Sequence, residues 1–302
     1  MNAKTKKIRN MTPKDAVFEI AIRIIGALIL FLILYPLYYV VICSFSEPTK
    51  IITGQVWLLP VQPTLEGYRY LLAEDGIWTG YRNTLFYSLM GTALSLLTTV
   101  PAAYALSRRD FKPRKGLMIF FMITMYFGGG LIPTYLLVAN TLHMDNTVWV
   151  MIVPFCVSVY NLIVVRTYFE NSLPAELWEA AQLDGCSNTR YLLKIAIPLS
   201  KSVICVVMLY YIVGKWNEYF TALIYINDSK LIPLQLVLRN ILIMNETAAD
   251  AMTGGAGMAV VVRRATLVKY TSIIVGTLPM MILYPFIQKY FEKGVMIGAI
   301  KG

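Results

Sequence analysis

The sequence contains little charge, a single histidine and few cysteines. Charged residues make up 15% of its 302 residues, whereas a water-soluble domain carries about a quarter. Because so few charged side chains cannot cover a soluble surface, the chain is expected to be an integral membrane protein. The four cysteines form no C-x-x-C pair and no metal-ligand spacing, which argues against a disulfide framework or a metal site.

Nucleotide-binding and hydrolytic motifs are also missing. No G-x-x-x-x-G-K-[ST] occurs, and Gly214-Lys215-Trp216 lacks both the leading glycine and the following Ser or Thr. We therefore expect the chain to bind neither ATP nor magnesium and to carry no cofactor of its own. The sequence also has no H-E-x-x-H and no G-x-S-x-G, so it does not support a membrane enzyme.

Long apolar runs are abundant, and 57% of the residues are hydrophobic. Runs of about 20 apolar residues cross a bilayer as helices, because in lipid the backbone must satisfy its own hydrogen bonds. We predict an all-α, polytopic membrane protein in which residues 1–302 form a single transmembrane domain. The six predicted spans are residues 22–45, 81–107, 116–138, 147–168, 199–224 and 268–291.

The basic residues are concentrated in alternate connections between these runs. If the N-terminus is inside, the inner segments 1–23, 108–115, 166–201 and 289–302 hold 18 of the 27 Lys and Arg residues. The outer segments hold 8, and Lys215 lies within a span. Because Lys and Arg favour the cytoplasmic side, both termini are predicted to be cytoplasmic. The same asymmetry accounts for the net charge of +10 without a nucleic-acid partner.

Proline and glycine interrupt several predicted spans. Pro101, Pro154 and Pro279 each remove one helical hydrogen bond, and Gly128-Gly129-Gly130 adds a flexible stretch to the third span. Transporter helices tolerate such breaks, but for any single proline ordinary kinked packing is the favoured explanation.

The inner segment Glu170–Lys201 is polar, yet it is patterned like two short helices. Pro174 suits a first helical turn, and Gly185 stands where a helix ends in a left-handed residue. Ser187 is a candidate cap for the second helix, which Pro198 limits at its far end. We predict a helix–turn–helix at the membrane surface that suits docking of a soluble partner rather than catalysis.

This segment carries a spaced motif. Glu179-Ala180-Ala181 is followed by three residues, the last of them Asp184, and then by Gly185. After nine intervening residues comes Ile195-Ala196-Ile197-Pro198. The pattern resembles the EAA motif of permease subunits of binding-protein-dependent ABC importers, with Ile197 where the family has Leu. The resemblance implies that Glu179, Ala180, Ala181, Asp184, Gly185, Ile195 and Pro198 form the surface that couples the chain, through a loop at about residues 170–198, to a separate ATPase.

Other motifs extend the resemblance over nearly the whole chain. Asn83-Thr84-Leu85 and Trp216–Phe220 are typical of sugar-importer permeases, and residues 288–302 are similar to the tail of maltose-type permeases. Tyr126–Pro133 and Leu234-Gln235-Leu236 resemble a subgroup that imports polysaccharide fragments.

This resemblance implies a type I ABC importer permease bundle in a bacterial cytoplasmic membrane, with a cytoplasmic tail at about 292–302. The implied partners are a second permease subunit, two ATPase subunits that bind ATP and Mg, an extracytoplasmic binding protein and an oligosaccharide. Two alternatives remain at the level of the sequence, an ion-coupled secondary transporter and a membrane receptor or scaffold without transport. The first predicts internal repeats and more in-span charge than Lys215 and Glu218 supply.

Residues late in the fifth predicted span are candidates for the substrate pathway. Ionisable residues inside spans are costly and usually functional, and aromatic faces suit sugar rings. The candidates are Asn83, Trp216, Asn217, Glu218 and Tyr219. A structural ion pair between Lys215 and Glu218, with aromatics at the membrane interface, is an equal alternative.

Overall fold

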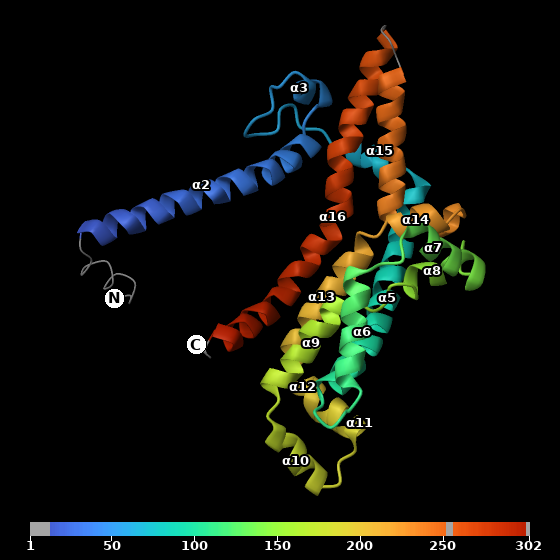
Figure 1. Cartoon of the computed structure of the whole chain (residues 1–302). Coiled ribbons are helices and arrows are strands. Elements are labelled where there is room, and N and C mark those ends of the chain that lie inside the picture. The colour runs from blue at the N-terminus through green and yellow to red at the C-terminus, as the bar shows by residue number, and fades with distance from the viewer. Residues whose placement is uncertain (1–12, 252–255, 300–302) are drawn as a thin grey trace. The chain divides into compact units, whose positions relative to one another are not determined.

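The computed structural model describes residues 13–251 and 256–299, and in these residues every regular element is a helix (Figure 1). The all-α prediction is therefore confirmed. The described residues group into two compact units, which are treated separately below. Unit 1 contains the chain up to Leu71 together with residues 242–275, and unit 2 contains residues 72–241 and the chain from Gly276 onward.

Unit 1 begins with α2 (Pro13–Ser44), the first predicted span. Its apolar 18-residue window has no buried share, as expected of a helix whose surroundings are lipid or partner chains. The short helices α3 (Pro48–Ile52) and α4 (Glu66–Leu72) follow. Ile42, Cys43, Ile51 and Val56 form a small buried cluster there. The later parts of the unit belong to α15 (Leu234–Ala251) and α16 (Ala256–Ala299).

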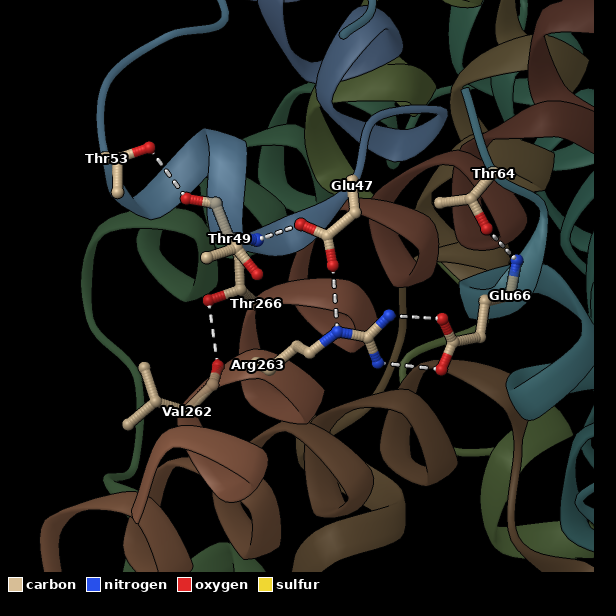
Figure 2. Close-up of polar contacts among 8 residues, drawn as sticks. All are labelled: Glu47, Thr49, Thr53, Thr64, Glu66, Val262, Arg263 and Thr266. Carbon is tan, nitrogen blue, oxygen red and sulfur yellow. Dashed lines mark hydrogen bonds and ion pairs between the residues drawn. The ribbon is translucent and has the colours of Figure 1, made fainter. Parts of the chain in front are cut away.

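An arginine connects these parts of unit 1 (Figure 2). Arg263 of α16 donates from Nε to Glu47 Oε1 at 2.9 Å, and from Nη1 to Glu66 Oε1 at 2.8 Å. Glu47 also caps α3 by accepting the backbone N–H of Thr49 at 2.6 Å. We call Arg263, Glu47 and Glu66 the Arg263 cluster. This cluster attaches the segment that runs from the end of α2 to the start of α4 to helix α16.

Unit 2 is centred on α5 (Asp75–Ser107), which lies beside α9 (Val159–Ser172) and α13 (Lys201–Trp216) (Figure 1). Helix α6 (Arg114–Tyr126) packs on α5 and α9. The apolar side chains between these helices form the main core of the unit, which includes Ala103, Leu162, Val165 and Val207.

Three predicted spans are interrupted. The third consists of α6, a break that contains Gly130 at φ +87°, α7 (Leu131–Leu136) and the π-helix η1 (Leu137–Thr141). Its two parts are bent by 112°. The glycine run explains the break, because position 130 needs a positive φ that glycine adopts at little cost.

The fourth and fifth spans break at different points. Between α8 (Trp149–Ile152) and α9, Pro154 removes a donor and Phe155 adopts φ +59°. The fifth span ends as a long helix at Trp216, and α14 (Phe220–Tyr225) starts after Asn217–Tyr219. Predicting continuous helices over 116–138, 147–168 and 199–224 was therefore wrong.

Three described helices are long and apolar enough to cross a membrane, and up to five if each of two bent pairs counts as one span. They are Val17–Ser44, Asp75–Ser107 and Gly257–Phe286. The last begins 11 residues before the predicted start at residue 268, because the outer connection is itself helical. The six-span count stays a prediction, as does the single domain.

Candidate functional sites

The segment with the EAA pattern forms the predicted pair of helices, which we call the knob (residues 174–199). Helix α10 (Ala175–Leu183) is followed by α11 (Asn188–Tyr191), the π-helix η2 (Leu192–Ala196) and α12 (Ile197–Leu199). In Figure 1 α10 lies at one end of unit 2, beyond the ends of α6 and α9. The knob is therefore a terminal feature of this unit.

The turn of the knob is fixed by backbone geometry. Gly185 has φ +69°, its N–H donates to the carbonyl of Gln182 at 3.0 Å, and the N–H of Cys186 donates to that of Ala181 at 2.9 Å. These two bonds form a Schellman motif, which satisfies the last carbonyls of α10 and requires a left-handed residue at position 185. The predicted role of Gly185 in the turn is confirmed.

The second half of the knob also starts as predicted. The Ser187 hydroxyl accepts the backbone N–H of Arg190 at 3.3 Å and caps α11. Pro198 does not end the helix, which continues to Leu199 before an 85° bend into α13. The π-turn just before Pro198 rearranges the hydrogen bonds, so the missing proline donor is tolerated.

The residues of the EAA pattern differ in exposure. Glu179, Ala180 and Asp184 are exposed, whereas Ala181 is buried against the core of unit 2. Ile195 is half-buried against the same core, and Pro198 is exposed. Ala181 therefore holds α10 on the unit, while its neighbours in the pattern present a surface.

Sequence reasoning missed Leu183 as part of this surface. It is 91% exposed at the C-terminal end of α10, directly before Asp184. Apolar exposure is ordinary on a lipid-facing helix, but this segment is polar. The signal in the sequence was a leucine between Gln182 and Asp184, just before the glycine turn.

A cavity of about 260 Å³ lies in unit 2 between the break after α8 and helix α13. Its lining includes Met151, Phe155, Ser158, Asn161, Tyr210, Tyr211, Lys215 and Glu218. Tyr211 and Lys215 are four residues apart on one face of α13, and Glu218 follows three residues later in the turn after that helix. This spacing was visible in the sequence, but only Glu218 was chosen as a pathway candidate.

Lys215 of α13 is positioned by two other elements of unit 2. Its Nζ donates to the carbonyl of Met151 at 2.9 Å, at the end of the broken helix α8. Its aliphatic stem crosses Gly91 of α5, where a Cβ would lie 3.1 Å from Cε of Lys215. The ammonium is thus bonded to a helix C-terminus, where cations are favoured, rather than to the carboxylate of Glu218.

Two further contacts shape the cavity. Glu218 Oε1 accepts the backbone N–H of Thr221 at 3.0 Å, in the first turn of α14. The hydroxyl of Tyr211 lies 2.7 Å from Thr99 Oγ1 and accepts the N–H of Ser158 at 3.1 Å. Helix α5 therefore lies behind the cavity lining, where Thr99 contacts Tyr211 and Gly91 contacts Lys215.

The other predicted pathway residues do not line the cavity. Asn217 Nδ2 donates to the carbonyl of Val213 at 2.9 Å, and Tyr219 is 42% exposed. Trp216 is buried and donates from Nε1 to the carbonyl of Gly276 at 2.9 Å. Trp216 thereby binds Gly276, the residue at which α16 enters unit 2.

Asn83 has a structural partner that the sequence did not reveal. Its Nδ2 donates to the carbonyls of Lys230 and Ile232 at 2.7 and 3.0 Å. Thr84 Oγ1 accepts the N–H of Leu234 at 2.8 Å. The Asn83-Thr84-Leu85 motif of α5 therefore contacts the Leu234-Gln235-Leu236 motif and fixes the start of α15.

In the described residues no group of three or more His, Cys, Asp or Glu side chains is arranged to hold a metal. The residues of the C-terminal tail that carry the maltose-type resemblance lie partly outside the described residues, since Ile300, Lys301 and Gly302 are not described. Gly254 and Gly255, in the predicted outer connection between the fifth and sixth spans, also lie outside the described residues, as do residues 1–12 of the basic N-terminal segment.

Residues 76–297 match the family model described as "Binding-protein-dependent transport system inner membrane component". The chain is 38% identical over 267 residues to Protein LplC of Bacillus subtilis (strain 168), covering 88% of this chain and 89% of that protein. It is 35% identical to the polygalacturonan/rhamnogalacturonan transport system permease protein YtcP of the same organism, over 96% and 100% of the two chains.

A solved structure shares the fold. It is the crystal structure of a bacterial ABC transporter involved in the import of the acidic polysaccharide alginate, with a TM-score of 0.81 and 30% identity. The match covers 93% of this chain and 99% of that chain.

Proposed function

Because the chain belongs to the family of binding-protein-dependent transport system inner membrane components, we propose that it couples a separate ATPase to the passage of an oligosaccharide through the membrane. The chain is a membrane-embedded permease component of an ABC importer. The resemblance found in the sequence is thus confirmed at the level of the family. The ATP-binding subunits, the second permease subunit, the binding protein and the cytoplasmic position of both termini are parts of the proposal.

The observation that carries this proposal is the surface of the knob. Leu183 is an almost fully exposed apolar side chain on a polar segment, next to the exposed Glu179, Ala180 and Asp184. A small apolar centre with acids around it fits a socket on a soluble protein, since the centre of an interface is depleted of charge and its rim is polar. The ATPase subunit is the partner that this class of transporter requires.

The cavity beside α13 supports an oligosaccharide as cargo. Phe155, Tyr210 and Tyr211 offer aromatic faces, and Asn161, Lys215 and Glu218 offer groups that bond to hydroxyls or carboxylates. Relatives are named for arabinooligosaccharides as well as for polygalacturonan and rhamnogalacturonan. We infer an oligosaccharide cargo, and a carboxylate-bearing fragment would find a cation in Lys215.

Two substitutions at Gly185 test the coupling role. No atom lies within 4 Å of a Cβ built there, so a new side chain meets no obstacle and only the positive φ matters. Asn tolerates this conformation and Val does not, at a cost of about 1–2 kcal/mol. We expect Gly185→Asn to retain ATP-driven uptake and Gly185→Val to lower it about tenfold in proteoliposomes that hold the assembled transporter.

The probes are labelled oligogalacturonate and labelled arabinooligosaccharide. A Leu183→Cys variant should in addition form a cross-link to the ATPase subunit and not to the binding protein. Equal uptake by the Val and Asn variants, together with no cross-link, would refute docking through the knob. Uptake of neither probe by the parent chain would refute the cargo proposal alone.

A further inference from the structure

Helix α10 of the knob is attached to the core of unit 2. Helix α10 reaches the core through two side chains, Ala181 and Trp178. The Trp178 ring is the larger of these contacts. It meets the Tyr191 ring edge-on, with centroids 5.0 Å apart and planes at 87°.

A second neighbour of Trp178 is a cation at the C-terminal end of α5. The guanidinium carbon of Arg108 lies 3.8 Å from the centroid of the Trp178 ring and 5.8 Å from that of Tyr104. Arg108 is the first residue after α5, and its side chain is only 14% exposed. A cation stacked on tryptophan with little water around it is among the stronger cation–π contacts.

The orientation of Arg108 is fixed by a carboxylate in its own plane. Nε and Nη2 donate to the two oxygens of Asp110, each at 3.0 Å. These hydrogen bonds lower the pKa of the Asp110 carboxyl, so it is charged at neutral pH. Only a planar, forked guanidinium can bind a carboxylate at its edge and a ring on its face at once, so lysine is not an equivalent residue.

Tyr191 closes the arrangement on the far side. Its ring stacks on Tyr104 of α5 at 6.1 Å and 29°, and Tyr191 is 2% exposed. Trp178, Arg108, Tyr104 and Tyr191 therefore form a closed set of contacts between the knob and the end of α5. Arg108 is the member that joins α10 to α5 directly.

Helix α5 leads from this set to the cavity. Thr99 bonds to Tyr211 and Gly91 supports the stem of Lys215. At 1.5 Å per residue, Gly91 lies about 25 Å along the helix from Arg108. A displacement of α10 that moves Arg108 would thus act on the same helix that contacts Tyr211 and Lys215 of the cavity lining.

We propose that Arg108 is a positioning residue for coupling, which seats the docking helix α10 through Trp178 and passes its displacement to α5 and the cavity. The proposal rests on the proposed function, in which α10 contacts an ATPase. It assigns to Arg108, Trp178 and Asp110 a role that lies outside the EAA pattern.

Two native cysteines provide the test, because one lies in the knob and the other lies next to the cavity. Cys186 is half-buried directly after the turn of the knob, and Cys156 follows Phe155 at the cavity. In a chain whose other cysteines are replaced by Ala, Arg108→Gln should raise the rate of maleimide labelling of Cys186 about five- to tenfold. Arg109→Gln, at the exposed neighbouring position, is the matched control and should change the rate less than about twofold.

Substitutions of Trp178 test whether its ring is the partner through which Arg108 holds α10. Trp178→Leu should raise the rate at least as much as Arg108→Gln, because it also removes the ring contact with Tyr191. The double variant should add nothing beyond Trp178→Leu, because the contact between Arg108 and Trp178 is already lost. Trp178→Phe retains an aromatic face and should restore most of the protection. Additive effects of the two substitutions, or an unchanged rate in Arg108→Gln, would overturn the proposal.

A second measurement separates coupling from mere folding. In the assembled transporter with binding protein, AMP-PNP should change the labelling of Cys156 in the parent chain and leave it unchanged in Arg108→Gln, although the ATPase still copurifies. A normal Cys156 response in Arg108→Gln, or loss of the ATPase from that variant, overturns the coupling role. If the ATPase does not copurify even with the parent chain, the proposed function itself has failed.

Discussion

Arg108 in unit 2 and Arg263 in unit 1 each attach a loop or a short helix to a long helix, but they do so through different kinds of contact. Arg108 is stacked on Trp178 and is 14% exposed, whereas the Arg263 side chain is 35% exposed and meets two carboxylates. One contact depends mainly on an aromatic face, and the other depends on opposite charges in partial contact with solvent.

The difference predicts how each contact responds to solution conditions. Ion pairs near a surface are screened by salt and lost when the carboxylates are protonated. A buried cation–π contact keeps its strength as long as the cation keeps its proton, which arginine always does. Cys43 is 2% exposed in the cluster of unit 1, and Cys186 lies in the knob, so one native thiol reports on each contact.

The largest effect in unit 1 is expected from removing Arg263. Arg263→Gln leaves Glu47 and Glu66 without their shared cation, and like charges close together repel. Because the three side chains are between 21% and 49% exposed, we expect only about 1 kcal/mol of local destabilisation. Labelling of Cys43 should become about fivefold faster, while labelling of Cys186 stays the same.

Lys269→Gln is the control for Arg263→Gln, since it removes an exposed cation from the same helix. Adding Glu66→Gln to Arg263→Gln should recover part of the protection, because it removes the repulsion. A Cys43 rate within a factor of about two of the parent would show that the Arg263 cluster does not hold unit 1.

The two regions also differ in how far the sequence predicts them. The knob depends on local rules: Gly185 supplies a positive φ and Ser187 a cap, and both were predicted. Its attachment was not predicted, because Arg108 and Trp178 are 70 residues apart and a single sequence contains no information about such pairing. Arg108 instead counted as one of several basic residues that set the topology.

The cavity shows the same limit more strongly. Lys215 and Glu218 are near in sequence and suggested an ion pair, but the ammonium bonds to Met151, 64 residues away. The carbonyl of Met151 is available because α8 ends there, and that break depends on Pro154 and on the positive φ of Phe155. Helix continuity was overestimated for the same reason, since hydropathy measures the length of an apolar run and not its bends.

A smaller effect is expected from acid. In Glu66, hydrogen bonds from Arg263 hold the pKa of the carboxyl below its ordinary value of 4.5. In Glu47, partial burial acts to raise the pKa, but hydrogen bonds from Arg263 and Thr49 outweigh it and the pKa is lowered. A lowered folded pKa means that the stabilisation is complete above about 4.5 and is lost as the pH falls through the folded value.

Cys43 should therefore keep its protection from pH 7 to about 4.5 and lose it progressively below. Arg263→Gln should show no such step. The measurement uses dithiodipyridine, with each rate divided by that of the unfolded chain at the same pH. Asp110 has a lowered pKa too, but the stack of Arg108 on Trp178 survives its protonation, so Cys186 should respond less. A larger increase in labelling with acid at Cys186 than at Cys43 would show that the contact of Arg108, and not the Arg263 cluster, depends more on charged carboxylates.

The smallest effect is expected from salt, and it separates the two contacts most directly. Raising NaCl from about 0.1 M to about 1 M shortens the Debye length from about 10 Å to about 3 Å. This screens the partly exposed Arg263 cluster, so Cys43 should be labelled faster, by less than about twofold. The stack of Arg108 on Trp178 excludes most solvent, so the Cys186 rate should not rise with salt. An equal response of both thiols, with Lys269→Gln again as the control, would mean that the two arginines hold their units by the same electrostatic mechanism.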